Sequence, residues 1–313
     1  CGVAAGCRVP IVMPVVNRSL VAPWSLWCDH SDTMAERDTG WLQFYCSTVQ
    51  EILDLQLCAY RISEHENVMT PSMVCFDGFY LSHSMQRVDT PSDEEAWDFV
   101  KPYVRKNMYL DTKDVMFIND LCPTVEHTEM KYQQKVGFDE AAKVAKEVFA
   151  EYEERFGRKL QAVETYCLED AEVAVVTMGS MSGTGKYVVN QLREQGIKAG
   201  LLRICMFRPF PAEEVKEALK NIPIIGVVDR SSGLGAAQGP VCSEVKAALS
   251  GMDNKVFGYV GGIAGRDISD GSFRKIFGEL LDIHAGKADA VTTWFDVRPD
   301  AMDMREVETN VNV

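Results

Sequence analysis

The second half of the chain alternates short apolar runs with amphipathic segments, and no other feature constrains the fold as strongly. The apolar runs that predict strands occupy residues 172–177, 199–204, 222–228 and 255–260. Helical spacing between them predicts one helix over 184–195, a second that Pro211 opens, and a third that ends near residue 249. Strands that alternate with helices in this way predict a parallel sheet with helices on its faces.

The first half is less regular but still predicts strands and a helix. Apolar, β-branched residues predict strands over 10–16 and 70–76. Helical spacing after Gly40 predicts a helix whose apolar positions are Leu42, Tyr45, Val49, Leu53 and Leu57. The predicted strands and helices of the two halves together place the protein in the α/β class.

The middle of the chain and its end contain different kinds of segment. Residues 138–156 predict an amphipathic helix that Gly157 ends, and we expect it to connect two domains. Residues 88–135 have little periodicity and are expected to run over the surface. Residues 298–313 are polar and are expected to form an arm or tail.

Length and charge limit the function. A chain of 313 residues suggests about two domains, and a net charge of −14 argues against nucleic acid and anionic membranes as partners. No run of about twenty apolar residues predicts a membrane span, and no secretory signal is found. The chain opens without Met on residues 1–6 (CGVAAG), which resemble a helix end, so we expect part of the native polypeptide to precede Cys1.

The ten cysteines are scattered and form no Cys-x-x-Cys pair. Iron–sulfur and zinc sites need clustered thiolates, so no such centre is expected on this chain alone, and no metal ligands are assigned. Several cysteines, such as Cys58, Cys75 and Cys205, lie among apolar neighbours, where buried free thiols belong. Free thiols predict a reducing compartment, and hence a cytoplasmic protein.

Residues 17–41 form a polar loop directly after the strand predicted over 10–16. Sites in α/β proteins lie at the carboxyl ends of strands, so we expect something to bind here. Arg18 is the leading candidate, since its planar guanidinium can pair with a substrate carboxylate. The alternative is a structural ion pair at the sheet end. Trp24 and Trp27 either belong to the core or form the wall of a pocket.

The run Asp29-His30-Ser31-Asp32 has the residue types of a catalytic triad or a metal site. Neighbours in sequence seldom converge on one point, which argues against a triad, and a hard-metal site would need further carboxylates. The interpretation we favour is a loop whose carboxylates cap helices or pair with Arg37.

Two glycine-rich segments invite nucleotide-binding hypotheses. Residues 178–186 (MGSMSGTGK) have one residue too many for a phosphate loop, so we expect a tight strand-to-helix turn, whose amides could still bind an anion. Residues 231–239 (SSGLGAAQG) depart from the dinucleotide fingerprint in spacing and follow the wrong strand. We expect close backbone packing or a partner surface there rather than NAD.

Taken together, several segments occur in the order found in one enzyme family: 17–23 (NRSLVAP), 29–32 (DHSD), 37–41 (RDTGW), 74–79 (VCFDGF), 178–184 (MGSMSGT), 202–211 (LRICMFRPFP) and 261–266 (GGIAGR). With these segments, which span nearly the whole chain, the protein resembles the α subunit of 2-oxoacid:ferredoxin oxidoreductases of the pyruvate synthase type. The resemblance implies a domain like the pyrimidine-binding domain of thiamine diphosphate enzymes over 1–165. Over 166–313 it implies a domain like the carboxy-terminal domain of transketolase.

The resemblance also implies cofactors and partners. In the family, thiamine diphosphate lies between this subunit and a β subunit that contacts the diphosphate and Mg²⁺. Oxidative decarboxylation of a 2-oxoacid, with pyruvate as the default, sends electrons to [4Fe-4S] clusters on β, γ and δ-type partner subunits and to ferredoxin, while CoA takes the acyl group. The substrates 2-oxoglutarate, oxalate and branched 2-oxoacids are alternatives within the same family.

Individual residues follow from the same resemblance. Arg18 matches the arginine that pairs with the substrate carboxylate. Near the active site the resemblance also places Asn17, Asp29, His30, Asp32 and Arg37. The family's Tyr-Pro-Ile-Thr-Pro segment and its cofactor-activating Glu do not occur in this sequence and are expected upstream of Cys1.

Two hypotheses from other classes stay open. A non-catalytic scaffold subunit would keep the fold without the activating Glu. A stand-alone transketolase-like transferase would need a Gly-Asp-Gly and Asn motif for the diphosphate and Mg²⁺, which the chain lacks.

Overall fold

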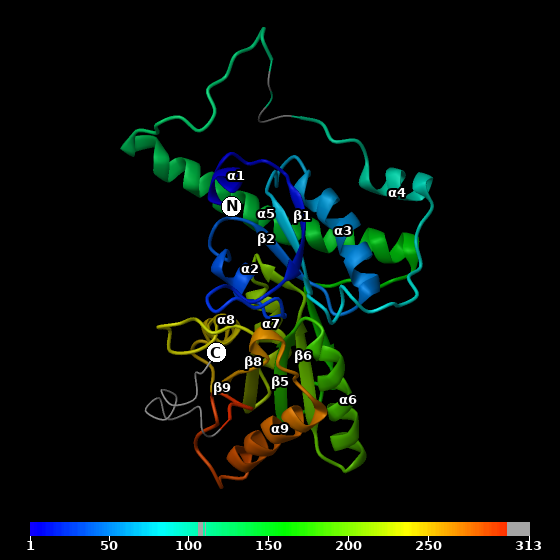
Figure 1. Cartoon of the computed structure of the whole chain (residues 1–313), viewed down its shortest axis with the longest axis vertical. Coiled ribbons are helices and arrows are strands. Elements are labelled where there is room, and N and C mark those ends of the chain that lie inside the picture. The colour runs from blue at the N-terminus through cyan, green and yellow to red at the C-terminus, as the bar shows by residue number, and fades with distance from the viewer. Residues whose placement is uncertain (106–108, 110, 299–313) are drawn as a thin grey trace.

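The protein is described here by a computed structural model, which covers residues 1–105, 109 and 111–298. The described residues form two sheets, which lie one above the other in Figure 1. The upper sheet has the strand order β1-β3-β2-β7, and the lower sheet has the order β4-β6-β5-β8-β9. Of the tail expected over 298–313, only Arg298 lies within the described residues.

The lower sheet confirms the parallel sheet predicted for the second half. Its parallel strands are β5 (Val173–Met178), β6 (Ala199–Ile204), β8 (Ile224–Asp229) and β9 (Lys255–Val260). A short strand that the sequence did not predict, β4 (Val163–Tyr166), pairs antiparallel with β6 at the edge. Every residue of β5, β6 and β8 is buried, which explains why these strands are continuous apolar runs rather than alternating patterns.

Helices cover both faces of the lower sheet. On one face, α6 (Met181–Glu194) and α9 (Asp270–His284) share a core with Val173 and Val175 of β5. On the other face, α7 (Ala212–Leu219) and α8 (Pro240–Ala248) pack on Ala174 and Val176. Helix α6 begins earlier than the residue 184 expected from the sequence, and α9 was not predicted.

The upper sheet draws its strands from both halves of the chain. Strands β1 (Val12–Asn17) and β2 (Leu42–Tyr45) both run parallel to β3 (Ser72–Asp77). The fourth strand, β7 (Met206–Arg208), pairs antiparallel with β2, although it follows β6 of the lower sheet in sequence. The domain boundary at residue 165 stays a prediction, and β7 is a point at which the second half of the chain crosses it.

The predicted helix that begins at Leu42 is wrong at its start. Residues Leu42–Tyr45 form β2, and α3 (Val49–Ser63) begins after Thr48, whose side chain accepts a hydrogen bond from the Glu51 N–H at 3.2 Å. All the residues of β2 are buried. A strand that is buried on both faces has no alternation, so its apolar residues extended the helical spacing of α3 by chance.

The segment 88–135 is more ordered than its sequence suggested. It contains α4 (Asp93–Val100), which starts at a capping box of Ser92 and Glu95, and the first turns of α5 (Thr124–Phe156). Because these first turns of α5 are largely exposed, only the packed part of the helix has an amphipathic pattern. Gly157 ends α5 with a φ of +68°, as expected.

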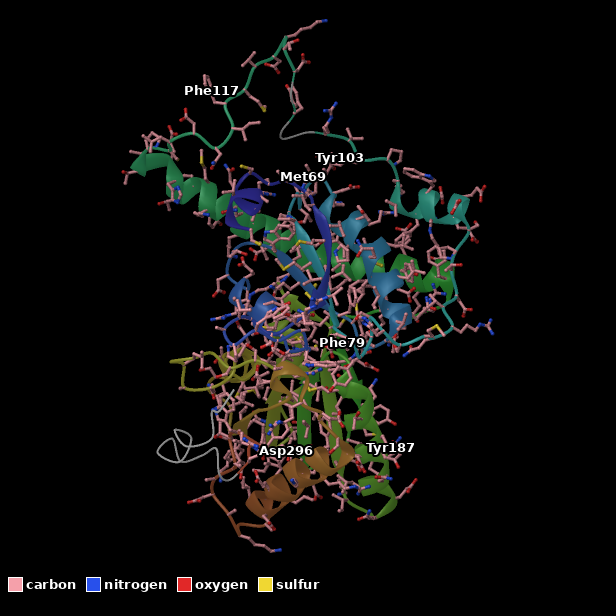
Figure 2. All side chains as sticks on the ribbon, in the orientation of Figure 1. Met69, Phe79, Tyr103, Phe117, Tyr187 and Asp296 are labelled. Carbon is pink, nitrogen blue, oxygen red and sulfur yellow. The ribbon has the colours of Figure 1, made fainter. Side chains whose placement is uncertain are left out.

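One stretch of this segment does run over the surface. Residues 111–123 extend away from the upper half in Figure 1, and Figure 2 shows Phe117 on this extension, where it is 89% exposed. Among the described residues, no helix combines the length and apolar character that crossing a membrane requires.

A shared core joins the two sheets. Buried residues of the upper half, including Met34, Trp41 and Tyr45, belong to the same cluster as Met178 and Ile204 of the lower sheet. The short helices α1 (Gly2–Gly6) and α2 (Ser31–Ala35) lie on the upper half. The opposite face of the upper sheet packs against α3 and α5.

Candidate active site

The carboxyl ends of strands from both sheets meet at the junction of the two halves. Figure 2 shows Phe79, which follows β3, at this junction. The residues beyond β1 begin with Arg18, and the loop from there returns to α2. Since ligands of α/β proteins bind beyond the carboxyl ends of parallel strands, this junction is the candidate active site.

A largely buried network of polar and charged side chains lies here. The Asp77 Oδ1 atom lies 2.8 Å from His30 Nε2, and Asp77 Oδ2 accepts hydrogen bonds from Arg230 Nη1 at 2.9 Å and from the Ser180 N–H at 3.0 Å. The Ser180 hydroxyl also donates to Asp77 Oδ2. We call Asp77, His30, Ser180 and Arg230 the Asp77 network. It connects the ends of β3, β5 and β8 with the start of α2.

The electrostatics of the network favour an ionised Asp77 and a protonated Arg230. Burial by itself would raise the pKa of the Asp77 carboxyl, but Arg230 and His30 hold it well below its usual range. Burial would likewise lower the pKa of Arg230, and the negative charge of Asp77 reverses this and raises it. A carboxylate so strongly held is a poor general base, so the network serves to join the two sheets.

The glycine-rich segment 178–186 contributes to the Asp77 network. This segment forms the turn from β5 into α6, as expected, and the anion at the helix start is the Asp77 carboxylate of the other sheet. Gly179 has a φ of +76°, and a Cβ atom there would lie 3.1 Å from both Asp77 Oδ2 and His30 Nε2. Glycine is therefore required by backbone conformation and by space together.

The second glycine-rich segment, 231–239, packs closely at its two ends, as one of the two expectations had it, while residues 234–237 are exposed. Asp229, at the end of β8, accepts hydrogen bonds from the N–H groups of Val241 and Cys242 at 2.8 and 3.0 Å. A Cβ atom on Gly239 would lie 2.2 Å from Asp229 Oδ2. Burial raises the pKa of Asp229 to about 7, against the effect of these two hydrogen bonds.

Asn17 and Asp32 hold the backbone at Arg18. The buried Asn17 side chain donates to Asp32 Oδ1 at 2.8 Å and to Thr33 Oγ1 at 2.9 Å. Asp32 Oδ2 accepts the Arg18 N–H at 2.9 Å. Burial raises the pKa of Asp32, while hydrogen bonds from Arg18 and Asn17 oppose the shift. The two residues thus position Arg18 through its main chain.

Three further polar residues of the loop contact other parts of the protein. Asp29 accepts hydrogen bonds from the Ser31 N–H at 2.9 Å and from the Ala264 N–H at 3.0 Å, so it ties the start of α2 to the loop after β9. His30 contacts Asp77 rather than a neighbouring serine, which excludes a triad within 29–32. The expected pairing of Arg37 with these carboxylates is wrong, because its guanidinium contacts Asp38 at 3.5 Å and the Met34 carbonyl.

The Arg18 side chain is exposed, and no side chain among the described residues pairs with its guanidinium. The alternative of a structural ion pair is therefore not seen in the part of the chain that the structure describes. Trp24 is 77% exposed and Trp27 is 54% exposed, so the core interpretation is wrong for both. Trp27 packs against Phe79, with ring centroids 4.4 Å apart. The loop therefore presents one exposed cation, Arg18, and exposed aromatic side chains at Trp24 and Trp27.

The sequence did not single out Asp77, Ser180 or Arg230. Each stands at or just after the end of a strand, and this position was the signal that could have indicated them. Their convergence depends on the packing of the two sheets, which no local pattern reveals. Among the described residues, no group of three His, Cys, Asp or Glu side chains could hold a metal ion.

The fold and this candidate site define an α/β protein with two parallel-dominated sheets whose carboxyl edges meet at one junction. Residues 1–150 match the family described as pyruvate flavodoxin/ferredoxin oxidoreductase, thiamine diP-bdg. Residues 171–272 match pyruvate:ferredoxin oxidoreductase core domain II. The chain belongs to the pyruvate:ferredoxin oxidoreductase family, in the group of pyruvate synthase α subunits, and is thus a subunit of a 2-oxoacid oxidoreductase.

Curated relatives align over most of their own length. Pyruvate synthase subunit PorA of Thermotoga maritima is 43% identical over 282 residues, which are 90% of this chain and 72% of the relative. The PorA subunit of Methanocaldococcus jannaschii is 40% identical and covers 95% of this chain and 75% of its own. Ketoisovalerate oxidoreductase subunit VorA of Pyrococcus horikoshii is 36% identical, with coverage of 94% and 75%.

A solved structure shows the same fold. It is the 2-oxoglutarate:ferredoxin oxidoreductase from Magnetococcus marinus with 2-oxoglutarate, coenzyme A and succinyl-CoA bound. The TM-score is 0.61 at 14% identity, and the match covers 90% of this chain and 50% of that chain. The expected α/β fold of thiamine diphosphate enzymes is confirmed by these comparisons.

Proposed function

We propose that this chain binds the carboxylate of a 2-oxoacid, most simply pyruvate, through Arg18 in a ferredoxin-linked oxidoreductase. The observation that carries the proposal is the exposed Arg18 guanidinium, which has no side-chain partner among the described residues and stands at the carboxyl end of β1. A planar guanidinium pairs with a carboxylate through two parallel hydrogen bonds. A cation held ready at this place suits an anionic substrate.

The main chain at Arg18 is held in place, which supports a role in orientation. Asp32 accepts the Arg18 N–H, and Asn17 holds Asp32. Through Asp29 and the Asp77 network the same loop is attached to the lower sheet. Precise placement of a binding group lowers the entropic cost of reaching the reactive geometry. The proposed roles are therefore substrate binding for Arg18 and positioning for Asn17 and Asp32.

Thiamine diphosphate fits this chain in part. The exposed apolar surface of Trp24, Trp27 and Leu20 suits the rings of the cofactor, whereas the described residues offer no carboxylate cluster for Mg²⁺. Following the family resemblance, we assign the contacts to the diphosphate and Mg²⁺ to a partner subunit. When bound, the cofactor supplies the nucleophilic carbon and the electron sink that decarboxylation of a 2-oxoacid requires.

Electron acceptors and the acyl acceptor complete the proposal. Electrons pass to [4Fe-4S] clusters on β, γ and δ-type subunits and then to ferredoxin, and CoA takes the acyl group. Clusters are assigned to partners because the ten cysteines of this chain are scattered. Pyruvate is the first choice of substrate because relatives named pyruvate synthase reach 43% identity, while those named for ketoisovalerate and phenylglyoxylate are 36% and 38% identical.

The test is viologen reduction by the native complex, purified anaerobically through this chain. The substrates are pyruvate, 2-oxoglutarate, 2-oxoisovalerate and oxalate, each with and without CoA. We expect reduction with pyruvate that depends on CoA. Reduction with another acid alone would replace pyruvate, and no reduction by a complex loaded with its cofactors would favour the scaffold hypothesis.

The variant Arg18→Gln tests the residue itself. Hydrogen bonds to charged groups contribute about 1.5–3 kcal/mol each, so we expect kcat/KM for the preferred acid to fall roughly tenfold to hundredfold or more. Arg274→Gln on α9 is the matched control, because Arg274 contacts Asp270 and Gln191 on the outer side of the lower half. Unchanged kcat/KM in Arg18→Gln would remove the assignment.

A further inference from the structure

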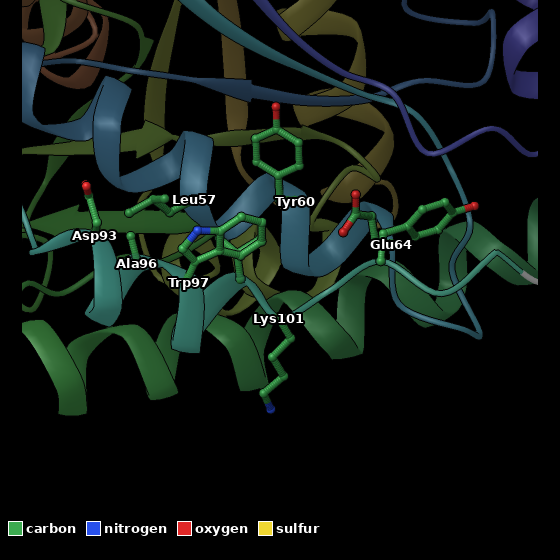
Figure 3. A pocket seen from close by; sticks show the side chains of 9 residues that line it. Leu57, Tyr60, Glu64, Asp93, Ala96, Trp97 and Lys101 are labelled. Atoms are coloured by element: carbon green, nitrogen blue, oxygen red, sulfur yellow. The ribbon is translucent and has the colours of Figure 1, made fainter.

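A cleft with aromatic walls lies between α3 and α4, on residues that the candidate active site does not use. Its volume is about 450 Å³. Figure 3 shows the side chains that line it, among them Tyr60 of α3 and Trp97 of α4. Tyr103, beyond α4, is a third aromatic residue of the lining. Solvent reaches all three rings, with 37% of Tyr60, 67% of Trp97 and 39% of Tyr103 exposed.

Carboxylates accompany these rings. Glu64 and Asp93 belong to the lining, and Glu64 is half-buried. No described residue forms a hydrogen bond or ion pair with the Glu64 carboxylate, and burial raises the pKa of this group. Lys101 also lines the cleft, but Figure 3 shows its ammonium pointing away from Glu64 and Trp97. The cleft therefore contains an unneutralised acidic group among aromatic faces.

This combination has a definite chemical preference. The faces of Trp and Tyr rings attract cations, most strongly where water is partly excluded, and a nearby carboxylate adds charge attraction. A contact of this kind already joins α3 and α4, because the guanidinium of Arg61 on α3 lies 5.3 Å from the ring centroid of Phe99 on α4. A guanidinium or ammonium group is thus the class of ligand that the cleft fits.

The surroundings indicate a side chain from a protein rather than a free cation. A second cleft of about 380 Å³ shares Glu64, Val100, Lys101 and Tyr103 with the first, so the groove continues along the chain past α4. The second cleft gives room for residues next to a basic anchor. The net charge of −14 favours basic partner segments in general.

We propose that the cleft formed by Tyr60, Glu64, Asp93, Trp97 and Tyr103 docks a Lys or Arg side chain of a partner subunit. The relatives of this chain are themselves named as subunits. Arg18 takes no part in the cleft, so this inference and the proposed catalytic role can fail separately.

The decisive experiment is a photo-crosslink in the purified native complex. Trp97→p-benzoylphenylalanine places the reactive group in the cleft, and Tyr187→p-benzoylphenylalanine on the outer face of α6 is the control. After irradiation, peptide mass spectrometry identifies the attachment site. We expect the position-97 probe, but not the control, to attach to a partner subunit within a few residues of a Lys or Arg.

Other attachment sites would overturn the inference. These are a second copy of this chain, a partner peptide without basic residues, or this chain alone, and the absence of any crosslink from an intact complex counts equally against it.

A second measurement uses Glu64→Gln, with the exposed Glu154→Gln as the control. Native mass spectrometry across a salt series should show a dissociation constant raised about tenfold for Glu64→Gln only, with kcat/KM per intact complex unchanged. Equal dissociation in both variants would contradict the proposal.

Discussion

The variant Asp77→Asn tests the claim that one buried carboxylate joins the two sheets. Asparagine has nearly the same size and shape, so the substitution removes the charge without creating a cavity. Arg230, which is 3% exposed, would then keep its charge without a counter-ion. One amide oxygen would also have to replace two carboxylate oxygens that accept from His30, Arg230 and Ser180.

The expected loss of stability is large. Removing one partner of a buried, hydrogen-bonded ion pair costs about 3–5 kcal/mol. Because the asparagine oxygen can still accept a hydrogen bond, we expect the lower end, about 3 kcal/mol in the free energy of unfolding. Urea unfolding at pH 7, followed by far-ultraviolet circular dichroism, measures it. Asp170→Asn is the control, since that exposed carboxylate pairs with Arg193 at the surface and should matter little.

The pH dependence separates charge from shape. In the unfolded chain the carboxyl has a pKa of about 3.9, whereas in the folded protein the pKa of Asp77 is lowered. The ionised group therefore contributes its full stabilisation above about pH 5, and this contribution is lost as the pH falls toward the folded-state pKa. The difference between wild type and Asp77→Asn should shrink in acid. A difference that is absent at pH 7, or that does not change with pH, would refute the reasoning.

Two further substitutions address the same junction. Gly179→Ala should cost about 1–3 kcal/mol in thermal unfolding, because it combines a φ of +76° with contact against the Asp77 network. Gly196→Ala has a φ of +81° and open space around the new methyl group, so it should cost clearly less, and equal losses would contradict the contact argument. Arg203→Met removes hydrogen bonds to Glu51 at 2.7 and 2.9 Å and to Glu164 at 2.6 Å. We expect a loss of about 3 kcal/mol in urea unfolding, and an unchanged midpoint would show that this buried arginine does not stabilise the fold.

Local patterns were reliable where an element is long or where its burial is typical. The parallel strands of the lower sheet follow from continuous apolar runs, and the packed part of α5 follows from its amphipathic face. Errors arose where burial changes within a segment. Strand β2 is buried on all sides and merged with α3, while the exposed first turns of α5 left no apolar stripe to detect.

The sequence by itself determined the family, the α/β class and the position of Arg18 directly after a strand. These features can be predicted from the sequence because strand and helix periodicity, turn residues and ordered motifs depend on residues that are near one another along the chain. Only the tertiary structure decided which charges meet. Asp77 lies 47 residues from His30 and 153 from Arg230 in sequence. It likewise placed β7 in the other sheet. Such contacts follow from how two sheets pack, and packing depends on burying apolar surface across the whole chain rather than on any local pattern.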